Sequence, residues 1–148
     1  MKQATTTIEV TPEGRYAFVD LTDELRRAIK DSGVTGGLAV AFCAHTTCAL
    51  LINEWEEGAM DDLRARIEAI VPEDAYYAHD DHDQRFGGFV EHERVNGHAH
   101  VKAMVLSATS HAIPVVDGEP ALGTWQRLIF FEMDEPKTRT VTFQIQGA

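Results

Sequence analysis

The stretch from Ala41 to Asp62 constrains the fold more than any other part of the chain. An apolar segment is interrupted by His45-Thr46-Thr47, resumes from Ala49 to Ile52, and is followed by Asn53-Glu54 and an acidic helical pattern. Short apolar runs bounded by turn-forming polar residues are typical of buried strands. A histidine between two such strands is expected at the rim of a core, where a ligand or a metal ion can reach it.

The remaining pattern predicts an α+β protein with two packed sheets and a single domain over residues 1–148. Helices are expected from Thr22 to Gly33, from an Asn53 cap to Pro72, and from Asn96 onwards. Pro12-Glu13-Gly14 favours an opening hairpin between the first two strands, and Asp117-Gly118 a later one. Alternating or apolar runs predict strands over 5–10, 15–19, 38–44, 48–52, 112–116, 122–133 and 139–146.

Charge and composition exclude several classes of partner. The formal net charge is −11, whereas a nucleic-acid backbone or an anionic membrane surface requires a basic footprint.

No apolar run approaches the roughly 20 residues of a transmembrane helix. The first residues hold no apolar signal core, and Cys43 and Cys48 are too few for a disulfide scaffold. The sequence therefore predicts a cytoplasmic location with free thiols.

Histidine is the most informative residue type. Five of the seven histidines lie between His79 and His100, within or just after a segment without sustained periodicity, and His45 stands apart at the strand rim. Imidazoles are common metal ligands, and carboxylates complete many such sites. The alternative interpretation is that these histidines are solvated partners of neighbouring aspartates. On a helix His98 and His100 stand about 200° apart, so at most one of them points into a site.

Other chemistries have less support. Cys43 and Cys48 flank His45, but both lie in apolar strands, where a buried and inert thiol is the usual state. No glycine-rich loop has the spacing of a nucleotide-binding motif. Trp125 and Gln126 are more typical of a core or an interface than of a ligand site. The candidates for contact with a phosphate group are Arg85, Arg94, Lys102 and Arg127.

Several short motifs together resemble the YjbQ-like family, which is described as secondary thiamine-phosphate synthases. The similarity covers nearly the whole chain, from about Thr5 to Gly147. The motifs occur in one order along the chain: His45-Thr46-Thr47, Asn53-Glu54, Tyr77-Ala78-His79-Asp80, Asn96 to Lys102, Pro114 to Gly118, and Leu122 to Gln126.

The resemblance implies a β2-α-β2-α-β3 sandwich, to which this chain adds a helix at Asn96, and a homotrimer. It also implies a pocket with a divalent metal (zinc, magnesium or manganese) at the family's histidine positions. His45, His79 and His100 match those positions and are the expected metal ligands, whereas His98 and His82 are not assigned. Asn53 and Glu54 match a polar pair and are assigned as catalytic. The residues assigned to substrate binding are Thr46, Thr47, Trp125 and Gln126.

The implied reaction is a weak, secondary thiamine-phosphate synthase activity, a transfer that joins an aminopyrimidine pyrophosphate to a thiazole phosphate and releases pyrophosphate. The acidic charge and the absence of a phosphate-binding loop leave two alternatives open. One is a metal-dependent hydrolase of a small phosphorylated or acyl metabolite. The other is a non-catalytic module that binds a metal or a small molecule, so whether the protein is an enzyme stays open at this point.

Overall fold

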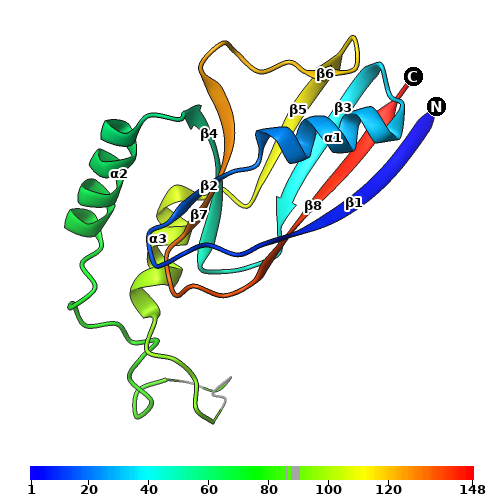
Figure 1. Cartoon of the computed structure of the whole chain (residues 1–148). Helices are drawn as coiled ribbons and strands as arrows, with labels where there is room; N and C mark the ends of the chain where they lie inside the picture. Colours follow the sequence, from blue (N-terminus) through cyan, green and yellow to red (C-terminus); the bar gives the residue numbers. More distant parts are fainter. Residues whose placement is uncertain (86, 88–90) are drawn as a thin grey trace.

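The computed structural model describes residues 1–85, 87 and 91–148, which form two antiparallel sheets and three helices (Figure 1). The five-stranded sheet has the order β1-β8-β3-β5-β6, and the three-stranded sheet has the order β2-β7-β4. The strands are β1 (Lys2–Val10), β2 (Phe18–Asp20), β3 (Gly36–Cys43), β4 (Cys48–Glu54), β5 (Ser110–Val116), β6 (Glu119–Pro120), β7 (Gln126–Glu132) and β8 (Arg139–Gly147). The helices are α1 (Thr22–Ser32), α2 (Glu57–Ile70) and α3 (Gly97–Leu106).

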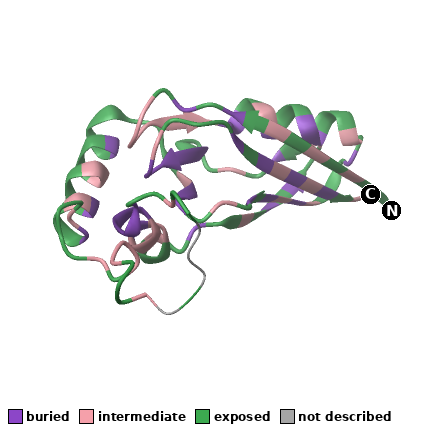
Figure 2. Cartoon of the chain, turned by 90° about the horizontal axis from the view of Figure 1, so that it is seen from below, coloured by how far each residue is buried: buried purple, intermediate pink, exposed green. Residues whose placement is uncertain are grey.

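The three-stranded sheet is the middle layer of the molecule. Side chains of successive residues in a strand point to opposite faces. Leu50 and Phe130 therefore join the core shared with the five-stranded sheet and α1, whereas Ala49 and Phe131 pack on the other side with Ala99 of α3. The buried side of each helix faces these layers and the outer side is exposed (Figure 2). Both faces of β4 and β7 are thus covered, which explains their continuous apolar runs.

The predicted α+β class is confirmed, including the third helix, but the strand pattern differs at two points. The final group contains four strands rather than three, because the two-residue strand β6 pairs with β5 through the hairpin at Asp117 and Gly118, whose φ angles of 52° and 78° suit a type I′ turn. The expected hairpin between the first two strands is wrong. β1 pairs with β8 and β2 with β7, so the chain changes sheets between them.

Two predicted boundaries also shift. β4 pairs with β7 as far as Glu54, so Asn53 does not cap α2; the Glu56 carboxylate instead accepts hydrogen bonds from the backbone N–H groups of Gly58 and Ala59. β7 begins only at Gln126, because the backbone N–H of Gln126 donates to the carbonyl of Gly123 and closes a turn. Trp125 lies in that turn and not in a strand.

No helix among the described residues combines the length and the apolar composition needed to cross a membrane.

Candidate functional site

His45 lies in the loop between β3 and β4, at one end of the two sheets. Its Nε2 atom accepts a hydrogen bond from the backbone N–H of Thr140 at 3.0 Å. Burial, together with the positive charges of Arg139 and Lys137, lowers the pKa of His45. The imidazole is therefore neutral at pH 7 with its proton on Nδ1, and it can offer that N–H to a ligand.

His79 and His100 lie side by side although they come from different segments. Their ring centroids are 4.6 Å apart and the ring planes are inclined by 35°. Nδ1 of His79 is 2.9 Å from Oδ1 of Asp80, and Nε2 is 3.3 Å from Oε1 of Glu93, which also forms an ion pair with Arg85 at 2.7 Å. Burial, followed by the proximity of His79, lowers the pKa of His100.

Asp80 connects His79 to the start of α3. Its Oδ1 accepts hydrogen bonds from the backbone N–H groups of Asn96 at 3.1 Å and Gly97 at 2.9 Å. Burial alone would raise the pKa of Asp80, but these hydrogen bonds and the one from His79 outweigh it and lower the pKa. Gly97 is needed here, because a Cβ atom at this position would lie 2.6 Å from Cβ of Tyr77.

His98 turns away from His100, as their helical spacing predicts. It is buried, its ring lies 6.4 Å from that of Tyr77, and its Nδ1 has no hydrogen-bond partner within the described part of the chain. Burial, followed by the positive charge of Lys102, lowers its pKa. His82 is exposed on the loop after α2.

A pocket of about 380 Å³ lies between the β3–β4 loop and α3. His45 and Thr46 form one wall, and His100 lies on the other. Thr47 does not face this pocket: it is buried, and its Oγ1 accepts a hydrogen bond from Arg139. The residues that line the pocket are His45, Thr46, His100, Ala103, Met104, Ser107 and Thr109.

The other predicted residues gather at the opposite end of β4. Asn53 pairs with Arg127, and Glu54 pairs with Gln126. Since β4 runs extended from Cys48, these residues lie about 20 Å from the histidine end within one chain. They border two further hollows, and the smaller one, of about 250 Å³, is lined by Asp20, Glu54, Trp55, Thr124, Trp125 and Arg127.

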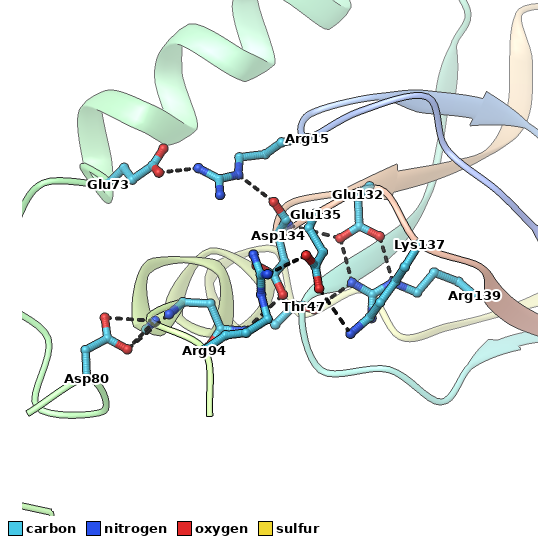
Figure 3. A network of polar contacts seen from close by, with 12 residues as sticks. Arg15, Thr47, Glu73, Asp80, Arg94, Glu132, Asp134, Glu135, Lys137 and Arg139 are labelled. Atoms are coloured by element: carbon cyan, nitrogen blue, oxygen red, sulfur yellow. Dashed lines mark hydrogen bonds and ion pairs between the residues drawn. The ribbon is translucent and has the colours of Figure 1, made fainter. Parts of the chain in front are cut away.

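A network of ion pairs supports the histidine end (Figure 3). Arg139 forms a buried pair with Glu132 through two hydrogen bonds of 2.7 and 2.8 Å. Asp134 accepts hydrogen bonds from Asn96 at 3.0 Å and from Arg94 at 3.4 Å, which ties the loop before α3 to the end of β7. This network was not predicted, because its members lie in different segments of the chain and share no local motif.

The basic residues considered for phosphate binding all have carboxylate partners. Arg85 pairs with Glu93, and Arg94 with Asp134. Lys102 is fully buried and pairs with Glu68, and Arg127 lies 3.8 Å from Asp20. Among residues 1–85, 87 and 91–148, no group of three or more His, Cys, Asp or Glu side chains is arranged to hold a metal ion.

The fold and the pocket define a small α+β protein with a ligand-sized hollow, in which histidine and hydroxyl groups stand among apolar side chains. Comparison with known proteins gives its family. Residues 6–148 match the family described as UPF0047 protein YjbQ-like, and the chain belongs to this family. A UPF0047 protein of Archaeoglobus fulgidus is 39% identical over 86% of this chain and 89% of its own length. The UPF0047 protein YugU of Bacillus subtilis is 30% identical over 95% and 98%.

Solved structures agree with the fold. A YbjQ-like protein of unknown function from Sulfolobus solfataricus P2 has a TM-score of 0.86 and 30% identity over 99% of both chains. A hypothetical protein from Aeropyrum pernix K1 has a TM-score of 0.85 and 33% identity over 98% of this chain and 99% of its own. The family predicted from the motifs is therefore confirmed.

Proposed function

We propose that the protein binds a divalent metal ion through His79 and His100 and acts on a small phosphorylated substrate in the pocket that contains His45. The observation that carries the proposal is the setting of His79, whose Nδ1 faces Asp80 while its ring lies against His100. A carboxylate bound to one ring nitrogen fixes the tautomer and makes the other nitrogen the metal-binding one. In His79 that nitrogen is Nε2, which faces Oε1 of Glu93 at 3.3 Å, so metal binding would replace this contact. Imidazole ligands favour zinc over magnesium.

The charges around the pocket support a role for a metal. A pyrophosphate group needs positive charge nearby, yet Arg85, Arg94 and Lys102 are already paired with carboxylates. His79 and His100 would hold the ion, and a divalent ion held there would supply that positive charge to a pyrophosphate group.

His45 has a different role in this proposal. Because its Nε2 accepts a hydrogen bond from Thr140, its Nδ1–H is the group offered to the pocket, and it donates to a substrate oxygen. The Oγ1 of Thr46, beside it in the pocket lining, adds a second polar contact. The reaction that the family resemblance implies is weak thiamine-phosphate formation, with release of pyrophosphate from the aminopyrimidine half.

A homotrimer is part of the proposal. Trp125 and Trp55 are 73% and 42% exposed beside Glu54, and exposed aromatic clusters of this kind are typical of interfaces. Asn53 and Glu54 are too far from the histidines of their own chain to act with them, so in a trimer they act on the pocket of a neighbouring copy. The free thiols of Cys43 and Cys48 favour a cytoplasmic location.

Light scattering tests the assembly. The parent protein should have the mass of three chains, and Trp125→Ala should lower it. Ile70→Ala removes an apolar side chain of similar exposure, 67%, from α2 and serves as the matched control. A parent mass of one chain, or an unchanged mass for Trp125→Ala, contradicts this placement of the interface.

An activity assay tests the reaction. Protein freed of metal and then supplied with zinc, manganese or magnesium is incubated with the two thiamine halves, separately and together. The proposal predicts thiamine phosphate only when both halves and a metal are present, and loss of product in His100→Ala. Release of phosphate from one half alone would instead identify a metal-dependent hydrolase. Retention of a ligand without turnover would identify a binding module.

A further inference from the structure

The two cysteines of the chain meet at the base of the loop that carries His45. Cys43 is the last residue of β3 and Cys48 the first of β4, and their Sγ atoms are 3.3 Å apart. Both thiols are buried and free. A disulfide bond requires an S–S distance of about 2.05 Å, so the two sulfur atoms need to approach by only about 1.3 Å.

The two thiols belong to different sheets. Cys43 pairs with Val141 of β8 in the five-stranded sheet, whereas Cys48 pairs with Glu132 of β7 in the three-stranded sheet. A bond between them would therefore join the two sheets covalently. It would also close a short ring around Ala44 to Thr47, the segment that presents His45 and Thr46 to the pocket.

We propose that Cys43 and Cys48 form a reversible disulfide when a small peroxide oxidises them. We propose further that this bond changes the position of the His45 imidazole in the pocket. The proposal does not depend on the metal or on the reaction proposed above. Both cysteines are 1% exposed, so the oxidant has to be as small as hydrogen peroxide. The 3.3 Å contact between the two sulfur atoms favours Cys43 as the attacking one. This contact, followed by the backbone of His45, lowers the pKa of Cys43, whereas the same contact and burial raise the pKa of Cys48.

The two steps balance without another reactant. The Cys43 thiolate attacks one peroxide oxygen, the O–O bond breaks, and hydroxide leaves, which gives a sulfenic acid. The Cys48 thiol then attacks the Cys43 sulfur and water leaves, so that two thiols and one peroxide give one disulfide and two waters. The two thiols lose two electrons and the peroxide gains them. A thiol reductant reverses the oxidation.

Intact-mass measurement of the folded protein tests the bond. After peroxide treatment at pH 7 without denaturant, the parent should lose about 2 Da, lose both titratable thiols and still migrate as a single chain on a non-reducing gel. Dithiothreitol should restore the original mass. Cys48→Ser keeps Cys43 but removes its partner, so this variant should gain oxygen instead. Unreacted thiols in the folded parent, or oxygen addition to the parent without loss of about 2 Da, would overturn the proposal.

Imidazole NMR signals test the effect on the pocket. Oxidation should shift the signals of His45 in the parent and leave those of His92, which is exposed on the distant loop, unchanged. Cys48→Ser treated in the same way should show no shift at His45 beyond that of the untreated variant. A disulfide that forms without any change at His45 would overturn the proposed link between the bond and the pocket.

Discussion

The imidazole rings of His79 and His100 pack with centroids 4.6 Å apart, although one residue lies in the loop after α2 and the other in α3. Asp80 accounts for this arrangement. Its carboxylate accepts a hydrogen bond from His79 and others from the backbone at the start of α3. One side chain thus orients the first histidine and holds the helix that carries the second.

Replacing Asp80 by Ala should destabilise the protein. The variant loses the carboxylate that caps α3, and the loss of such a cap with its partly buried hydrogen bonds costs about 1–2 kcal/mol. Urea denaturation should show a lower midpoint with an unchanged slope. Asp83→Ala, an exposed change in the same loop, is the control. Equal midpoints for the two variants would contradict the role of Asp80.

Gly97→Ala should also reduce stability. The new Cβ would meet Cβ of Tyr77 at 2.6 Å, so the loop after α2 has to move, at a cost of about 1–3 kcal/mol. Gly14→Ala is the matched control, because no atom lies within 4 Å of a Cβ at that position. Thermal unfolding monitored by circular dichroism compares the two. A fall in melting temperature no larger than that of the control would contradict the close packing.

Glu132→Gln should be the most destabilising of these changes. It leaves the buried guanidinium of Arg139 without a negative partner, which costs about 3–5 kcal/mol. Glu135→Gln, which alters a more exposed carboxylate nearby, should cost far less. If Glu132→Gln does not fold, the double variant Glu132→Gln/Arg139→Met should recover stability, because it removes the unpaired charge. Failure of the double variant to improve on the single one would contradict this explanation.

Stability should fall as the pH is lowered below neutrality. Burial lowers the pKa of His45, His98 and His100 in the folded protein, so the unfolded chain binds protons first, near its ordinary histidine pKa of about 6.5. Their contribution is fully present above that pH and is lost as the pH falls toward the folded-state values. Urea denaturation at pH 7.5 and 5.5 should show the loss, and His98→Gln should reduce it. His92→Gln, an exposed change, should leave the loss of stability between pH 7.5 and 5.5 unaltered. An equal loss of stability in the two variants would contradict the prediction.

Local sequence patterns predicted most of the fold, because helix ends and tight turns depend on residues that are close together in the sequence. Gly33 ends α1 in the left-handed conformation with φ of 66°, as a glycine after a helical stripe predicts. The hairpin at Asp117-Gly118 follows from its turn chemistry. The partner of β1 did not follow, because pairing Lys2 with Gly147 joins the ends of the chain and leaves no local signal. For the same reason Glu93 was missed beside His79.

The candidate site was predicted in part. The histidine motifs led to His45, His79 and His100, and the structure brings the last two together and sets His45 on the same pocket as His100. The family resemblance assigned Glu54 to the same site as these histidines. Glu54 is the last residue of the seven-residue strand β4, whose rise of about 3.3 Å per residue puts it at the other end of the sheet. The length of an extended strand between His45 and Glu54 already implies that the two residues are far apart.

The most direct test of the central claim is the metal content of the protein, purified without a histidine tag and measured by mass spectrometry of the elements. The account predicts near-stoichiometric divalent metal in the parent and in His92→Ala, and its loss in the double variant His79→Ala/His100→Ala. The double variant should keep its folded circular dichroism spectrum. A parent without metal, even after incubation with zinc, or a folded double variant that retains as much metal as the parent, would contradict the account.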